Sequence, residues 1–132
     1  GDFTVRVKIT GEFGTQYDQA GIMVRIDEST WLKCGIEWMD GNQFASAVVT
    51  RDYSDWSIVS IPNPPSMWIE CERNATTFTV RYSLNGVTYE MIRQTFLTEE
   101  SEQQVGMMLA SPTGDGFDVR FEGYAVEESS PQ

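Results

Sequence analysis

The sequence predicts an all-β fold, a jelly-roll sandwich of two antiparallel sheets, from two observations. About ten short segments alternate apolar and polar residues, which is the period of a strand with one buried face. Clusters of Gly, Pro, Asn and Asp separate these segments, and no long helical pattern interrupts them. No repeat of about 20 to 50 residues is visible, which argues against a propeller or a solenoid. We therefore expect one β-sandwich domain over residues 1–132.

The clearest pair of strands lies on either side of the turn at residues 27–30. On the second strand, Trp31, Lys33, Gly35 and Glu37 share the face that does not carry the apolar residues. The apolar faces of this hairpin predict that the following residues are buried between the sheets: Ile22, Val24, Ile26, Leu32, Cys34, Ile36 and Trp38.

Further strands are expected before and after this hairpin. They cover residues 3–9, 44–50, 58–61, 67–72, 77–83, 89–93, 105–110 and 117–126. Asp40-Gly41 and Asn85-Gly86 favour tight hairpin turns, because glycine adopts positive φ without steric cost. Residues 51–57 are interpreted as a polar, aromatic segment that places Trp56 in a loop, and residues 98–104 as a second loop.

Composition and charge exclude several classes of function. The chain has 20 acidic and 9 basic residues and a net charge of -11, so it repels nucleic acid. No apolar run reaches the ~20 residues of a membrane helix, and no signal peptide is recognisable, so we expect a cytoplasmic protein. Cys34 and Cys71 fall on apolar strand faces, where we expect buried, reduced thiols.

The absence of histidine excludes serine–histidine and cysteine–histidine catalysis and histidine-bound zinc. A pair of carboxylates would suffice for glycoside hydrolysis, and Glu37 with Asp40 is the candidate pair, although one lies on a strand and the other in a turn. Asp115 and Asp118 lie near glycines and would suit calcium, but an ordinary turn explains them better. We expect no cofactor and no metal.

The polar side chains around the central hairpin form the candidate ligand site. Aromatic rings stack on the apolar faces of sugars, while carboxylate, guanidinium and amide groups supply directed hydrogen bonds. The alternative is that Arg25 and Lys33 simply pair with Glu37 across neighbouring strands. The residues expected to form one cleft are Asp18, Gln19, Arg25, Lys33, Glu37, Arg51, Asp55 and Trp56.

Three segments give the chain a resemblance to a known family. They read DQAG at residues 18–21, W-x-K-x-G-x-E at residues 31–37 and TR-x-x-SDWS at residues 50–57. Together with YSLNGVTYEMIR and VGMMLASPTGDGFDVRFEGYAV, they resemble the largely uncharacterised regulation-of-enolase-like family of concanavalin A-like lectin/glucanase domains. A looser similarity links the chain to the module that follows the catalytic domain of some β-xylosidases.

The resemblance implies a jelly roll whose ligand lies on the concave sheet. It also implies an opening segment before residue 1, since members of the family are longer at that end. Three functions remain open: a binding module for a carbohydrate or other small polar ligand, a regulatory protein that binds a metabolic enzyme, and a glycosidase-like enzyme.

Overall fold

The computed structural model describes residues 1–129, and this part of the chain forms ten strands and no helix. The strands are β1 (Phe3–Gly11), β2 (Gln19–Asp27), β3 (Thr30–Met39), β4 (Asn42–Arg51), β5 (Tyr53–Ser60), β6 (Met67–Asn74), β7 (Thr77–Ser83), β8 (Glu90–Phe96), β9 (Gln104–Ala110) and β10 (Val119–Glu128). Accordingly, nothing within residues 1–129 has the form of a helix that could span a membrane.

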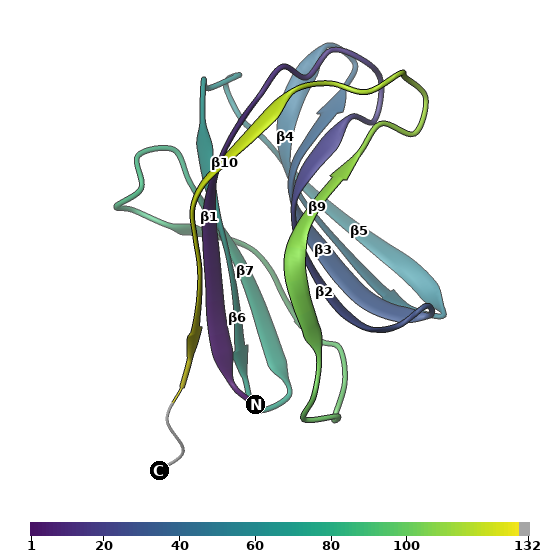
Figure 1. Ribbon diagram of the computed structural model, residues 1–132, viewed down its shortest axis with the longest axis vertical. Coiled ribbons are helices and arrows are strands. Elements are labelled where there is room, and N and C mark those ends of the chain that lie inside the picture. Colours follow the sequence, from purple (N-terminus) through teal and green to yellow (C-terminus); the bar gives the residue numbers. More distant parts are fainter. Residues whose placement is uncertain (130–132) are drawn as a thin grey trace.

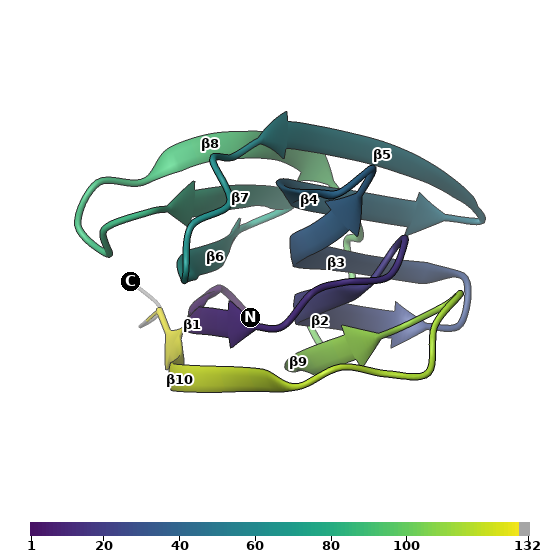
Figure 2. The ribbon, with the colours of Figure 1, turned by 90° about the horizontal axis from the view of Figure 1, so that it is seen from above.

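The strands form two five-stranded antiparallel sheets, which confirms the predicted sandwich (Figure 1). The back sheet has the order β10-β1-β6-β7-β8, and the front sheet has the order β5-β4-β3-β2-β9. Seen from above, β8 and β5 lie at one edge of the sandwich and β10 and β9 at the other (Figure 2). The front sheet is bowed, and the face turned away from the back sheet is its concave side (Figure 1).

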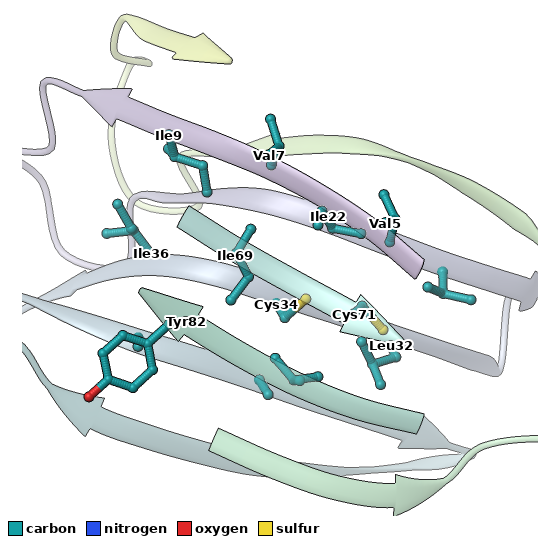
Figure 3. Packing of buried hydrophobic residues seen from close by; sticks show 14 of the residues in the cluster. Val5, Val7, Ile9, Ile22, Leu32, Cys34, Ile36, Ile69, Cys71 and Tyr82 are labelled. Carbon is teal, nitrogen blue, oxygen red and sulfur yellow. The ribbon is translucent and has the colours of Figure 1, made fainter. Parts of the chain in front are cut away.

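Alternate residues of the central strands fill the space between the sheets. The back sheet contributes residues such as Val5, Ile9 and Ile69, and the front sheet contributes Ile22 and Leu32, all of which are fully buried (Figure 3). Burial of this apolar surface is the main source of stability for such a domain, at about 25 cal/mol per Å². The predicted core residues Ile22, Val24, Leu32, Cys34 and Ile36 are confirmed, whereas Ile26 and Trp38 are only partly buried because they lie near the ends of their strands.

Cys34 of β3 and Cys71 of β6 meet at the centre of this core, one from each sheet (Figure 3). Both are free thiols and are buried. A hydrogen bond with Cys71, together with burial, raises the pKa of the Cys34 thiol well above its ordinary value. The predicted reduced and buried state of the cysteines therefore agrees with the structure.

Two local predictions were wrong. Residues 53–60 form strand β5 paired with β4, so Trp56 lies on a strand and not in a loop. Asn85 and Gly86 belong to a six-residue connection between β7 and β8, in which only Gly86 has a positive φ. The side chain of Asn85 accepts hydrogen bonds from the backbone N–H groups of Val87 and Thr88, which stabilises a wider loop than a two-residue turn. The turn at Asp40 and Gly41 is tight, as predicted, with positive φ at both residues.

Candidate functional site

The concave face of the front sheet consists of four cross-strand rows, each running from β9 through β2, β3 and β4 to β5. We name each row after its residue on β2 or β3. The Arg25 row is Gln104, Arg25, Trp31, Thr50 and Ser54, and the Lys33 row is Gly106, Met23, Lys33, Val48 and Trp56. The Gly35 row is Met108, Gly21, Gly35, Ser46 and Ile58, and the Glu37 row is Ala110, Gln19, Glu37, Phe44 and Ser60.

The carboxylate of Glu37 is held in a fixed position on this face. Its Oε1 atom accepts a hydrogen bond of 3.0 Å from the Ser46 hydroxyl and another of 3.0 Å from the indole N–H of Trp56. Glu37 is only 8% exposed, whereas Trp56 is 52% exposed and stands beside it. No side chain or backbone group within residues 1–129 donates a hydrogen bond to Oε2, so this oxygen is available to a ligand.

The two cations of the concave face are not paired with Glu37. Among the described residues, neither Lys33 nor Arg25 forms an ion pair or a side-chain hydrogen bond. The Lys33 ammonium lies 5.5 Å from the centre of the Trp31 ring. Burial lowers the pKa of Lys33 from its ordinary value of 10.5, and the negative charge of Glu37 opposes this shift. Simple structural pairing therefore does not explain these charges.

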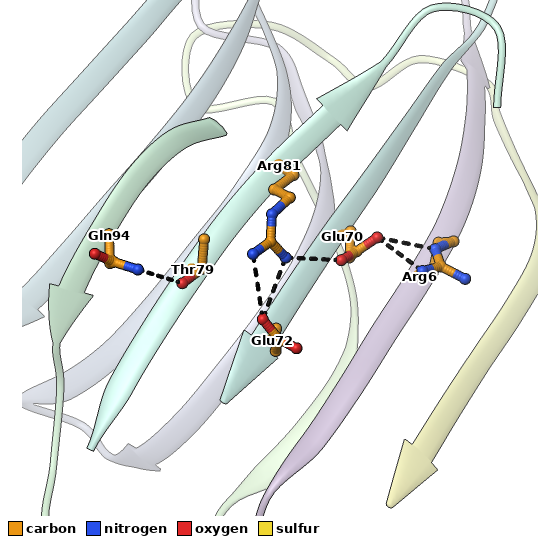
Figure 4. Close-up of polar contacts among 6 residues, drawn as sticks. All are labelled: Arg6, Glu70, Glu72, Thr79, Arg81 and Gln94. Atoms are coloured by element: carbon orange, nitrogen blue, oxygen red, sulfur yellow. Dashed lines mark hydrogen bonds and ion pairs between the residues drawn. The ribbon is translucent and has the colours of Figure 1, made fainter. Parts of the chain in front are cut away.

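The outer face of the back sheet shows what structural pairing looks like in this protein (Figure 4). Glu70 is 7% exposed and accepts hydrogen bonds from Arg6 on β1 and Arg81 on β7, at 2.8 and 3.0 Å. Arg81 also pairs with Glu72 at 3.3 Å. The charged groups on the back sheet thus pair with one another and stabilise the fold, whereas Lys33 and Glu37 on the concave face form no ion pair among the described residues.

Two glycines lie side by side at the centre of the concave face. Gly21 and Gly35 lie directly opposite each other in the Gly35 row, with Met108 opposite Gly21 on β9, and Gly106 lies one row away, opposite Met23. The resulting hollow beside Glu37 and Lys33 is shallow, with an enclosed volume of about 10 Å³. The backbone of Gly21 and Gly35 is itself buried, so these glycines serve the close approach of β2 and β3 and leave no open floor for a ligand.

Asp18 does not belong to this face. It is 1% exposed, and its carboxylate accepts hydrogen bonds from the backbone N–H groups of Gly14 and Thr15 and from the Ser111 hydroxyl. Burial raises the pKa of Asp18, but these three hydrogen bonds together outweigh burial and leave the pKa below 3.8. Asp18 therefore joins the loop before β2 to the loop after β9. Gln19, its neighbour, lies on the concave face opposite Glu37, and its amide donates to the Tyr17 carbonyl at 3.1 Å.

Arg51 and Asp55 lie on the opposite side of the front sheet from Trp56. The guanidinium of Arg51 lies 4.4 Å from the ring centre of Phe96 on β8, and Asp55 pairs with Arg93 of β8 at 3.8 Å. Both line a separate cleft of about 710 Å³ between β5 and β8. The structure thus places five of the eight predicted residues on the concave face (Gln19, Arg25, Lys33, Glu37 and Trp56), spread over its rows, and places Asp18, Arg51 and Asp55 elsewhere.

Ser46 is the residue of the site that the sequence analysis missed. It lies next to Gly35 on β4, where its hydroxyl orients Glu37. The signal that would have found it is the tight turn at Asp40 and Gly41, because that turn fixes the register between β3 and β4. Asp40, the proposed catalytic partner of Glu37, lies in this turn and exchanges hydrogen bonds with Gln16. No cluster of three or more Cys, Asp or Glu suited to a metal ion occurs within the described residues.

Comparison with known proteins agrees with the fold. Residues 1–129 match a family described as "Protein of unknown function (DUF1349)". Regulation of enolase protein 1 of Saccharomyces cerevisiae is 34% identical over 125 residues, which is 94% of this chain and 63% of that protein. This chain therefore spans less than two thirds of the length of that relative.

Two solved structures share the sandwich. A functionally unknown protein from Saccharomyces cerevisiae has a TM-score of 0.91 and 32% identity, over 98% of this chain and 71% of that chain. A xylan β-1,4-xylosidase from Bacillus halodurans has a TM-score of 0.83 over 96% of this chain and 28% of that chain. At 12% identity the second likeness shows the fold alone. The family match and the 34% identical relative confirm the resemblance found in the sequence: the chain belongs to the DUF1349 family and is related to Regulation of enolase protein 1.

Proposed function

We propose that this protein is a non-catalytic binding module whose concave face holds a carbohydrate or another small polar ligand. The observation that carries the proposal is the Glu37 carboxylate, which is nearly buried and fixed by Ser46 and Trp56 but keeps one oxygen without a partner among the described residues. A fixed acceptor of this kind suits a sugar hydroxyl, because its orientation is already set before the ligand arrives.

Trp56 supplies the second element of the proposed site. Its ring is 52% exposed while its N–H is used by Glu37, so the ring is held in one orientation. A fixed aromatic ring beside a fixed carboxylate suits a ligand with one apolar face and a rim of hydroxyl groups.

We propose binding in preference to glycoside hydrolysis because the second carboxylate is misplaced. Glycosidases need two carboxyl groups on either side of one bond. Asp40 lies in an exposed turn and is engaged with Gln16, while Glu37 lies on the concave face of the central strand β3.

A glycan array followed by a thermal-shift titration tests the proposal. A ligand at 100 times its Kd stabilises the native state by about 2.7 kcal/mol, which is readily visible as a higher Tm. Glu37→Gln and Trp56→Ala should weaken binding about tenfold or more, and Trp56→Phe, which keeps a ring but loses the N–H, should fall between Trp56→Ala and wild type.

Tyr53→Ala is the matched control, since Tyr53 is an exposed aromatic residue on the same strand but on the other side of the sheet. Full binding by both Glu37→Gln and Trp56→Ala, or loss of binding in Tyr53→Ala alone, would refute the proposed site.

A regulatory protein that binds a metabolic enzyme is the second candidate. It is supported by the 34% identity to a relative named Regulation of enolase protein 1. The edge strand β5 exposes Tyr53 (88%), Trp56 (52%) and Ile58 (42%), and aromatic edges of this kind are enriched at protein interfaces. Analytical ultracentrifugation of the chain with purified enolase tests this candidate, with Tyr53→Ser/Ile58→Ser as the variant that should lose the complex. Sedimentation of the two proteins as independent species would exclude it.

A further inference from the structure

We propose that the ligand of the concave face is an acidic sugar, in which a carboxylate on the sugar ring binds at Lys33 and Arg25 while a hydroxyl group binds at Glu37. This inference rests on the proposed function and adds the charge and the orientation of the ligand.

The charge of the concave face differs from that of the rest of the molecule. Its four rows contain three charged residues, Arg25, Lys33 and Glu37, so the face carries a net charge of +1 while the whole chain carries -11. At physiological ionic strength, charges further away than about 8 Å are largely screened. An anion at this face therefore interacts mainly with the local cations and not with the acidic remainder of the chain.

Lys33 is the cation that lacks a counter-ion. Its ammonium group has three N–H donors, yet no acceptor within residues 1–129 binds it, and its contact is with the Trp31 ring. Removal of a charge from water without a partner is unfavourable, and burial lowers the pKa of Lys33 accordingly. A ligand carboxylate at this position would supply the missing partner through a charge-assisted hydrogen bond.

The rows also define where each end of the ligand lies. Arg25 is one row from Lys33 on the neighbouring strand, with Gln104 directly opposite it on β9. This corner thus gathers two cations and an amide. Lys33 and Glu37 are four residues apart on β3, so their α-carbons are separated by about 13 Å. This spacing suits a disaccharide or a longer chain that runs along β3, with its acid group at the Lys33 row and the bound hydroxyl at the Glu37 row.

Four probes test the inference by isothermal titration. They are a β-1,4-linked disaccharide that ends in glucuronic acid, its methyl ester, the neutral disaccharide cellobiose, and cellobiose carrying a sulfate or a phosphate ester. We expect the acid to bind about tenfold or more tightly than its methyl ester and than cellobiose. Raising the salt concentration should reduce this preference and leave the affinity for the methyl ester unchanged.

Variants then test whether the preference for the acid over its ester comes from Lys33 and Arg25. Lys33→Gln should bring the acid-to-ester ratio close to one, Arg25→Gln should reduce it, and Lys33→Arg should restore part of it. Lys8→Gln is the matched control, because Lys8 lies 5.1 Å from the centre of the Trp68 ring on the back sheet, in the same type of contact as Lys33 with Trp31. This control should bind all probes as wild type does.

The pH profile gives an independent readout. The charged groups that face Lys33 are Glu37 on its own strand and Arg25 on β2, while the facing rows of β4, β5 and β9 contain none. As the pH rises through the lowered pKa of Lys33, affinity for the acid should fall, and affinity for the ester should not.

Each outcome has one meaning. Equal affinity for the acid, the ester and cellobiose overturns the inference but leaves the proposed function standing. A preference for the sulfate or phosphate ester overturns the assignment of a carboxylate. The absence of binding by all probes counts against both the inference and the proposed function, and an acid preference that survives Lys33→Gln shows that the acid binds elsewhere.

Discussion

Gly21→Ala should disrupt the centre of the front sheet. A Cβ atom at Gly21 would lie 1.8 Å from the Cys34 carbonyl oxygen and 2.7 Å from the α-carbon of Gly35. The obstacle is backbone, which cannot rotate away as a side chain does. To relieve the contact even to 3.0 Å, β2 and β3 must separate by about 1.2 Å at this point, which breaks the neighbouring ladder hydrogen bonds.

The expected cost follows from these two effects. Overpacking of this kind costs about 1–3 kcal/mol, and each ladder hydrogen bond lost costs about 0.5–1.5 kcal/mol. With two ladder hydrogen bonds lost, we therefore expect Gly21→Ala to lose about 2–6 kcal/mol of unfolding free energy, measured by urea denaturation.

Gly106→Ala is the control for this prediction. Gly106 lies on the same face of the next strand, and a Cβ atom there would meet nothing within 4 Å. We expect this variant to be neutral or more stable by about 0.4–1 kcal/mol, because alanine restricts the unfolded chain. A Gly21→Ala variant within 1 kcal/mol of the wild type would refute the reasoning about close strand approach.

Two further predictions concern buried groups. Asp18→Asn should lose about 1–3 kcal/mol at pH 7, because hydrogen bonds to a buried carboxylate are lost or reversed. Since the folded pKa of Asp18 lies below 3.8, this contribution is present above pH 3.8 and is lost as the pH falls through the folded pKa, so the urea midpoints of the two proteins should converge in acid. Cys34 and Cys71 should resist a thiol reagent in native buffer and react in urea, because both are buried, and because the hydrogen bond with Cys71 and burial disfavour the Cys34 thiolate. Rapid labelling of the native protein, or a Cys34–Cys71 disulfide found by mass spectrometry, would contradict this expectation.

The hairpin at residues 21–38 was predictable because its alternation is strong and one of its faces is fully apolar. A register slip of one residue would move Leu32, Cys34 and Ile36 to the outer face, so the buried pattern fixes which side Lys33 and Glu37 occupy. The sequence therefore sufficed to place these two charges on one face of the sheet.

The other site residues required tertiary information. On β5, Asp55 and Trp56 are adjacent in sequence and thus point to opposite sides of the sheet, but both sides are exposed at this edge, so no apolar pattern reveals the strand. Asp18 is a different case, since its partner Ser111 is 93 residues away in sequence and only the folded structure brings the two loops together.

The three glycines of the concave face have different structural reasons. Gly21 and Gly35 are required by the close approach of β2 and β3, so glycine would be needed at these two positions without any ligand. Gly106 has no such requirement, because its φ is not positive and a side chain there would contact nothing. Glycine weakens a strand, so its presence at residue 106 is better explained by the space it leaves in the Lys33 row. Gly106→Val should accordingly keep or raise the Tm while it weakens binding of the acidic disaccharide at the neighbouring Lys33. A Gly106→Val variant that binds as tightly as wild type would mean that this end of the row stays free of ligand.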